Sequence, residues 1–177
     1  QGARITNVAQ IYERSATTQI SFKDKNITSP ADLKGKKVGS WGFGNEWELF
    51  AGMQKDGVEL KDITLVQQAF DMNGFLSGDI DAAQAMTYNE YAQVLEAINP
   101  KTKKQYTPED LNVIDWNDVG TAMLQFAIWA DTEKLSEEGL ERAAEVQDAM
   151  QAVRESSLST AEGGRSLGET SADIDQS

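Results

Sequence analysis

The chain has 177 residues, of which 40% are hydrophobic and 25% charged, and its formal net charge is -13. This composition is typical of a folded globular protein, and the negative charge disfavours nucleic acid and anionic membrane surfaces as partners. Because the sequence lacks cysteine and histidine, it supplies no thiolate nucleophile, Ser-His-Asp triad, disulfide or His/Cys zinc site. We therefore expect small molecules or proteins as partners, and no cofactor.

No apolar stretch approaches the roughly 20 residues of a membrane span. The first residues, Gln1-Gly2-Ala3-Arg4, lack the basic start and apolar run of a secretory signal. We expect no direct membrane insertion of this segment, and a targeting signal that was removed or never present.

The first half of the chain alternates between strand and helix patterns. Residues 5–22 are rich in β-formers and predict one or two extended segments. Ser29 and Pro30 predict a helical turn over residues 29–35. A strand at 37–41, a glycine-rich loop at 42–44, a helix from 46, a strand at 63–66, a short helix at 70–76 and a strand at 80–86 follow. This order predicts an α/β domain with an open, mainly parallel sheet flanked by helices.

The second half begins with a helix over 91–98, a surface loop at 101–108 and strands at 111–114 and 123–129. From Ser136, apolar residues at helical spacing predict an amphipathic helix to residue 153. The tail from residue 156 is rich in Ser, Gly and Asp, and we expect its last dozen residues to be loosely held.

Four segments carry a resemblance to a known family: ITSPADLKGKKVG (27–39), GFGNE (42–46), SGDIDAA (77–83) and MTYNE (86–90). In order and spacing they resemble the second lobe of type II periplasmic substrate-binding proteins of ABC importers. The subgroup is the SsuA/THI5-like (NMT1/THI5) one, which includes thiamine-pyrimidine and riboflavin binding proteins. The resemblance covers residues 9–134. It implies that a small aromatic heterocycle is bound between two lobes without catalysis, with ABC permease subunits as partners. It also implies an extracytoplasmic location, in the periplasm or as a cell-surface lipoprotein.

The resemblance also implies domain boundaries. Residues 1–12 would be a hinge strand arriving from a first lobe that this chain lacks, and 13–123 the second α/β lobe. Residues 124–130 would be the returning hinge strand, and 131–177 a helical segment of the first lobe. The chain would then be a fragment that carries half of a binding site.

The glycine-rich loop supplies the first group of candidate ligand-binding residues. A loop between strand and helix exposes backbone N–H groups, while Trp41 or Phe43 can stack on a flat ring and Asn45 and Glu46 can bind its polar edge. Alternatively, Trp41 is a core residue and Glu46 a favourable acid in the first helical turn. No Lys-Ser/Thr follows the glycines, so this is not a phosphate loop. The candidates are Ser40, Trp41, Gly42, Phe43, Asn45 and Glu46.

The second group, Thr87, Tyr88 and Asn89, lies at the carboxyl end of a predicted strand, where ligands of open α/β sheets bind. Asn89 could instead only cap the next helix. We expect the segments around Asn45 and Asn89 to converge at a common rim. The resemblance adds Gln10, Tyr12 and Gln125, which lie on the presumed hinge strands.

Metal binding and catalysis are the competing interpretations. The pairs Asp79/Asp81 and Asp115/Asp118 could suggest a metal site, but the first matches a turn-and-strand junction of the family and the second lies in a polar loop. The related pyrimidine-precursor synthase uses pyridoxal phosphate and a cysteine-rich segment. The matching residues 120–126 contain no cysteine, so we expect a binding protein and not an enzyme. An interaction domain that borrows the fold is the third possibility.

Overall fold

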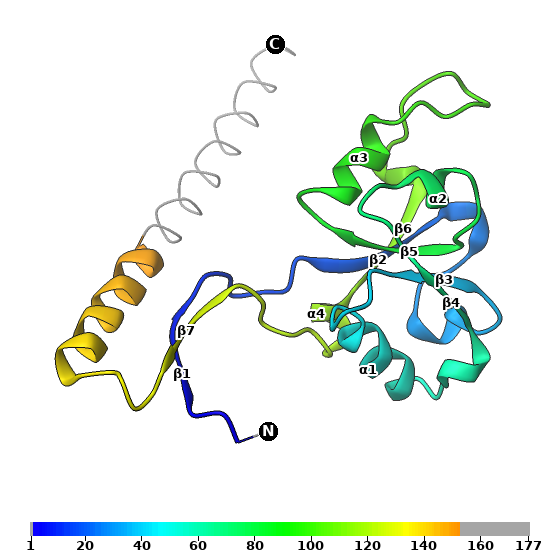
Figure 1. The fold of residues 1–177 in the computed structure, drawn as a ribbon. Helices are drawn as coiled ribbons and strands as arrows, with labels where there is room; N and C mark the ends of the chain where they lie inside the picture. The colour runs from blue at the N-terminus through cyan, green and yellow to red at the C-terminus, as the bar shows by residue number, and fades with distance from the viewer. Residues whose placement is uncertain (1, 153–177) are drawn as a thin grey trace, which may run out of the picture. The chain divides into compact units, whose positions relative to one another are not determined.

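The computed structural model describes residues 2–152, which divide into two compact units (Figure 1). Unit 1 comprises residues 2–13 and 124–152, and unit 2 comprises Arg14–Met123. No helix within residues 2–152 is long and apolar enough to cross a membrane. The predictions for the loosely held tail and for residue 153 lie outside the described residues.

Unit 2 is built on a five-stranded sheet with the order β4-β3-β5-β2-β6. The strands β3, β4 and β5 are parallel, whereas β2 runs antiparallel to both β5 and β6. The prediction of an open, mainly parallel α/β sheet is confirmed, since β3, β4, β5 and β6 all run in one direction. The exception is β2, the first strand of the unit, which inserts between β5 and β6 in the opposite direction. The strands are β2 (Thr17–Phe22), β3 (Lys37–Ser40), β4 (Thr64–Gln67), β5 (Ala82–Met86) and β6 (Leu111–Asp115).

Short helices connect these strands. The predicted turn at Ser29 is a 3-10 helix with a capping box, in which Asp32 accepts hydrogen bonds from the backbone and hydroxyl groups of Thr28 and Ser29. These bonds, led by that from the Thr28 N–H, hold the pKa of Asp32 below its ordinary value. The helices are α1 (Trp47–Lys55), α2 (Asn73–Leu76), α3 (Glu90–Glu96) and α4 (Trp116–Val119), and the 3-10 turns are Lys23–Lys25, Pro30–Leu33, Leu60–Asp62 and Pro108–Asp110.

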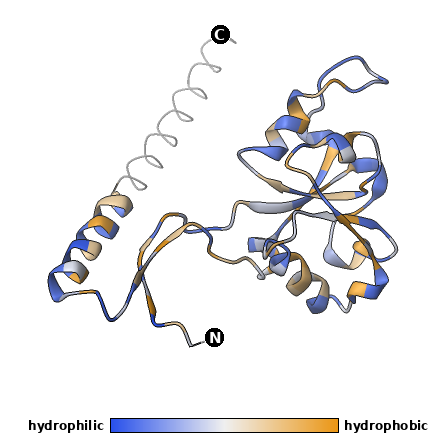
Figure 2. Cartoon of the chain, viewed as in Figure 1, coloured by the Kyte–Doolittle hydropathy of each residue, from blue (hydrophilic) through white to orange (hydrophobic). Residues whose placement is uncertain are grey.

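The core of unit 2 consists of two apolar clusters on opposite faces of the sheet. On one face, α1 and α4 pack Leu49 and Trp116 against Val38. On the other, α2 and α3 pack Phe75 and Val94 against Ile20. Figure 2 shows hydrophobic and hydrophilic colours alternating along the helices that flank the sheet. The alanines of β5 are fully buried, as expected for a strand packed on both faces.

Unit 1 pairs β1 (Ile5–Gln10) with β7 (Ala127–Asp131) in an antiparallel ladder, followed by a helix over residues 137–152. The helix begins after Ser136, whose hydroxyl accepts a hydrogen bond from the Gly139 N–H at 3.1 Å. The strand β7 begins later than the predicted residue 123, because Phe126 has a left-handed backbone with φ 57° that ends the extended run.

Candidate functional site

The two predicted loops emerge at the same edge of the unit 2 sheet. The strands β3 and β5 are parallel neighbours, so Ser40 and Met86 end at one edge. The side chain of Gln84 ties the loops together, since its Nε2 donates to the Asn45 carbonyl at 2.6 Å. We call this edge the rim and define it as residues 40–47, 67–71 and 86–90, which lie at the carboxyl ends of β3, β4 and β5.

The loop after β3 has an unusual backbone. Gly42, Phe43 and Gly44 all have positive φ, at 70°, 56° and 99°. Glycine adopts such angles freely, but a phenylalanine does so only at a cost in free energy. The loop is held by hydrogen bonds from the Gly42 N–H to Ser40 Oγ, from the Asn45 N–H to the Gly42 carbonyl and from the Gly44 N–H to Glu46 Oε2. The result is a Phe43 ring that is 97% exposed.

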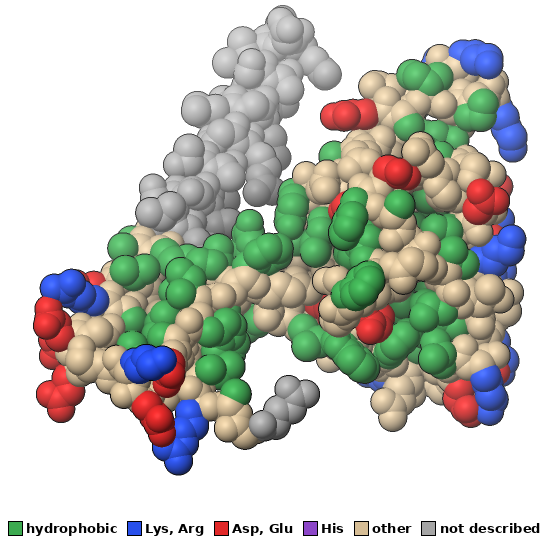
Figure 3. Space-filling model, viewed as in Figure 1, with side chains coloured by type: hydrophobic (Ala, Val, Ile, Leu, Met, Phe, Trp, Pro, Cys, Tyr) green, Lys and Arg blue, Asp and Glu red, His purple; other side chains and the backbone are tan. Residues whose placement is uncertain are grey.

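Trp41 and Phe70 form a ring pair with centroids 6.5 Å apart and planes inclined by 18°. Trp41 is only 4% exposed, whereas Phe70 is 78% exposed. The structure therefore favours the core interpretation of Trp41 and adds Phe70, which the sequence analysis missed. Figure 3 shows apolar side chains gathered on the surface of unit 2, and the exposed rings of the rim are Phe43, Trp47, Phe70 and Tyr88.

The predicted polar residues mainly fasten their own segments. Asn45 Nδ2 donates to the Gly42 carbonyl at 2.9 Å. Asn89 donates to Glu90 Oε1 at 3.0 Å and accepts from Gln93 Nε2 at 3.1 Å, so its amide serves the start of α3. Thr87 is exposed, and its N–H donates to the Ala16 carbonyl. The rim therefore exposes aromatic rings to a ligand more than it exposes side-chain amides.

Buried glutamines underlie the rim, and the sequence analysis did not single them out. Gln19, Gln68 and Gln84 are at most 5% exposed. Gln84 Oε1 accepts from the Trp41 N–H at 3.0 Å. Gln68 exchanges two hydrogen bonds with the backbone of Gln84, at 2.9 and 2.8 Å. The sequence signal was a glutamine within the small apolar strand Ala82–Met86, because a polar side chain buried there requires partners.

The rim is neutral to negative in charge. Residues 40–47, 67–71 and 86–90 contain no lysine or arginine. Glu90 of the rim and Glu48, which follows the rim segment 40–47 in α1, are 3% and 2% exposed. Each accepts a backbone hydrogen bond, Glu48 from Met123 at 2.6 Å and Glu90 from Met86 at 3.0 Å. An anionic ligand would therefore find no cationic side chain among the residues that define the rim.

The three hinge candidates lie in unit 1. Gln10 Nε2 donates to the Gln125 carbonyl at 2.7 Å, and the Gln10 N–H donates to Gln147 Oε1 at 2.9 Å. The Tyr12 ring meets the Phe126 ring edge-to-face at 5.4 Å. These contacts connect β1 to the segment preceding β7 and to the following helix.

The acidic pairs are engaged in protein contacts. Asp81 accepts from Lys25 Nζ at 2.7 Å and from the Lys37 N–H at 3.0 Å. Burial raises the pKa of Asp81, but these two bonds together with the charges of Lys25 and Lys36 outweigh it and hold the pKa below its ordinary value. Asp115 caps α4 through the Asn117 N–H. Within residues 2–152, no group of three or more Asp and Glu side chains could hold a metal ion.

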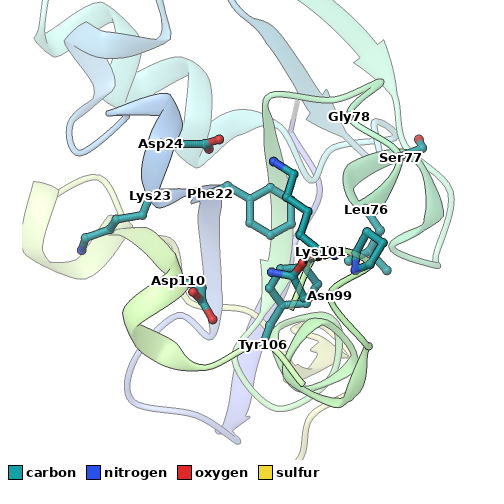
Figure 4. Close-up of a pocket in the computed structure, with 11 residues that line it drawn as sticks. Phe22, Lys23, Asp24, Leu76, Ser77, Gly78, Asn99, Lys101, Tyr106 and Asp110 are labelled. Atoms are coloured by element: carbon teal, nitrogen blue, oxygen red, sulfur yellow. Dashed lines mark hydrogen bonds between the residues drawn. The ribbon is translucent and has the colours of Figure 1, made fainter. Parts of the chain in front are cut away.

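A cavity of about 410 Å³ lies at the opposite edge of the sheet (Figure 4). Its walls include the rings of Phe22 and Tyr106, whose centroids are 5.1 Å apart, together with Leu76. Burial, and then the charges of Asp110 and Asp24, raise the pKa of Tyr106. None of the predicted site residues lines this cavity.

Comparison with known proteins identifies the family and the fold. The sequence profile of the NMT1/THI5-like family matches residues 1–162. The chain belongs to this family. Its fold is that of type II periplasmic binding proteins, as in the aliphatic sulphonate binding protein SsuA of Escherichia coli. That structure matches with a TM-score of 0.58 and 18% identity, over 89% of this chain and 53% of the other.

Two further structures resemble the NMT1/THI5-like chain. A protein from Bordetella bronchiseptica RB50 matches with a TM-score of 0.52 and 20% identity, over 75% of this chain and 42% of the other. The alkanesulfonate-binding protein SsuA from Xanthomonas axonopodis pv. citri, bound to MOPS, matches with a TM-score of 0.49 and 17% identity, over 92% of this chain and 56% of the other. No curated protein matches significantly. The chain thus spans about half the length of the solved structures it matches.

Proposed function

We propose that the chain is the ligand-gripping lobe of an ABC-importer solute-binding protein. The ligand is a small aromatic heterocycle, such as a thiamine pyrimidine precursor or riboflavin, held in an interlobe cleft without catalysis. Membership of the NMT1/THI5-like family and the type II binding-protein fold support this assignment. ABC permease subunits are the protein partners, and the location is extracytoplasmic, in the periplasm or on a cell-surface lipoprotein.

The observation that carries the proposal is the composition of the rim. Phe43 and Phe70 expose 97% and 78% of their surface beside the buried Trp41. Large exposed rings are costly in water, and they stack favourably on a planar guest. The rim also lacks lysine and arginine, which supports a heterocycle over a sulfonate or a carboxylate ligand.

The division into units supports a lobe-and-hinge arrangement. Unit 2, Arg14–Met123, is the ligand-gripping second lobe. Residues 1–12 and 124–130 are the two crossing hinge segments, in keeping with the pairing of β1 and β7. Residues 131–177 belong to the first lobe. Gln10, Tyr12 and Gln125, the remaining candidate ligand-binding residues, lie on these hinge segments.

The experiment is native mass spectrometry of the full-length protein purified from its own host. The expected result is a bound heterocycle, and riboflavin would also colour the protein. Calorimetry with that compound then compares Phe43→Ala with the wild type. Loss of one stacking face is expected to weaken binding by about 1–2 kcal/mol.

The matched control is Leu60→Ala. Leu60 is 53% exposed, but it precedes β4 and so lies at the opposite edge of the sheet. Its removal is expected to change affinity less than about twofold. A co-purified sulfonate or amino acid, or equal effects of the two substitutions, would contradict the proposed function.

A further inference from the structure

The parallel strands β3 and β5 separate as they approach the rim. Within residues 2–152 their ladder has one paired position, Val38 with Ala82. Beyond it, amide side chains replace the backbone ladder. The N–H and carbonyl of Gln84 both bond to the side chain of Gln68, while Gln19 Nε2 donates to the carbonyls of Gly39 and Ala82 at 3.0 and 2.8 Å.

Gln84 occupies the end of this separation. Its side chain is fully buried, and its amide makes two bonds of opposite sense to the loop after β3. The Oε1 atom accepts from the Trp41 N–H, and the Nε2 atom donates to the Asn45 carbonyl. Trp41 and Asn45 bracket the residues with left-handed backbones, including Phe43. A single amide thus fixes both ends of the strained loop.

Gln84 is held in turn by a rigid support. Gln68 continues the β3–β4 pairing, since its N–H donates to the Ser40 carbonyl at 2.8 Å. Its side chain lies across Gly39, where an added Cβ atom would be 2.6 Å from Gln68 Oε1. Each buried amide bond in such a network is oriented by the next, so the position of Gln84 is set by β4 as well as β5.

We propose that Gln84 is a positioning residue for ligand binding, which sets the height and tilt of Phe43 from beneath the rim without touching the ligand. The expected effect on ligand affinity rests on the proposed function, because it requires that a ligand binds at the rim, above a side chain that the ligand does not contact. The geometric part, that one amide orders the loop, stands on the hydrogen bonds alone.

The first test measures amide hydrogen exchange of the full chain without ligand. Gln84→Met keeps the side-chain length and removes both bonds, and Gln54→Met is the control, because Gln54 is exposed on α1. We expect exchange over residues 41–46 to become about tenfold faster in Gln84→Met only, with β2 and β6 unchanged. Uniform acceleration throughout unit 2 would show a merely structural role and overturn the proposal, as would an unchanged loop.

The second test uses Gln84→Glu and pH. A protonated glutamic acid can accept from the Trp41 N–H and donate to the Asn45 carbonyl, so it reproduces both bonds. Burial raises the pKa of a carboxyl group, so ionisation occurs above its ordinary range. As pH rises through that pKa, the donor is lost and a carboxylate faces a carbonyl oxygen. The ratio of loop exchange rates, Gln84→Glu over wild type at the same pH, should therefore be near one at low pH and rise with pH, and a ratio that stays flat would overturn the proposal.

The third measurement separates this inference from the proposed function. The full-length wild type, Gln84→Met and Gln54→Met are titrated with riboflavin and with the pyrimidine moiety of thiamine. We expect about five- to tenfold weaker binding for Gln84→Met alone. If the wild type binds neither probe, the proposed ligand class fails while the exchange result still judges the role of Gln84. If the wild type binds and Gln84→Met binds equally well, the positioning role fails.

Discussion

The two edges of the unit 2 sheet are built on opposite principles. At the rim, Phe43 has a left-handed backbone and an exposed ring, and the polar groups beneath it are buried amides. At the opposite edge, ion pairs and capping boxes close the turns, as with Lys25 and Asp81 or Thr107 and Asp110. At the rim, the left-handed and exposed Phe43 costs stability, whereas these side-chain contacts at the opposite edge supply it. Such an asymmetry is typical of a sheet that binds on one side only.

The largest expected effect is a difference in stability loss between alanine substitutions at two glycines, one near each edge of the sheet. Gly39→Ala would place a Cβ atom 2.6 Å from Gln68 Oε1 and 3.1 Å from Ile80, and we expect a loss of about 2–3 kcal/mol through overpacking. Gly78→Ala meets no neighbour within 4 Å but has φ 86°, and we expect about 1 kcal/mol. Urea unfolding of the full chain measures both, and equal losses would contradict the comparison.

The ion pair of the opposite edge gives the next effect. In the folded protein the pKa of Asp81 is lowered and that of Lys25 is raised, chiefly by their mutual hydrogen bond in the case of Lys25. The Asp81 contribution is therefore present above its unfolded pKa and is lost as pH falls through the folded one. The Lys25 contribution is present below its unfolded pKa and is lost as pH rises through the folded one. Asp81→Asn should cost about 1 kcal/mol at neutral pH and flatten both limbs of the stability profile.

At the rim, removal of the Phe43 side chain should not destabilise the fold. Asparagine tolerates the left-handed backbone better than phenylalanine does. The Phe43 ring is almost fully exposed, so its removal loses little buried apolar surface. We expect Phe43→Asn to leave stability unchanged or raise it by about 0.5–1 kcal/mol while ligand affinity falls. A clear loss of stability in thermal unfolding would show that the loop is not strained.

The smallest effect is expected in the cavity of the opposite edge. Tyr106 is partly buried there, near Asp110 and Asp24. Tyr106→Phe keeps the ring contact with Phe22 and removes only the hydroxyl, so stability should change by less than about 0.5 kcal/mol. Ligand affinity, measured in parallel by calorimetry, should not change. A loss of binding would place the ligand in this cavity and not at the rim.

The fold was predictable from the sequence to the extent that apolar spacing and turn residues determine it. The strand, loop and helix around Gly42, and the capped turn at Ser29, follow from such local signals. The insertion of β2 between β5 and β6 did not, because strand order depends on long-range pairing that no local pattern encodes. The left-handed Phe126, which delays β7, was equally invisible, since phenylalanine rarely adopts that conformation.

The candidate site divides in the same way. The convergence of the loops at Asn45 and Asn89 was foreseeable, because parallel strands end at a common edge. Which aromatic ring is open was not, since burial of Trp41 and exposure of Phe70 depend on tertiary packing. The supporting role of Gln84 left only one trace in the sequence, a polar residue among buried alanines.

The fastening of the loop by Gln84 has a consequence for how specificity could change. The bonds to Trp41 and Asn45 use main-chain atoms, so they do not depend on which side chain stands at position 43. The positive φ angles of Gly42 and Gly44 favour glycine at those two positions, but the side chain at position 43 can change to suit a different guest while the hydrogen bonds of Gln84 stay in place.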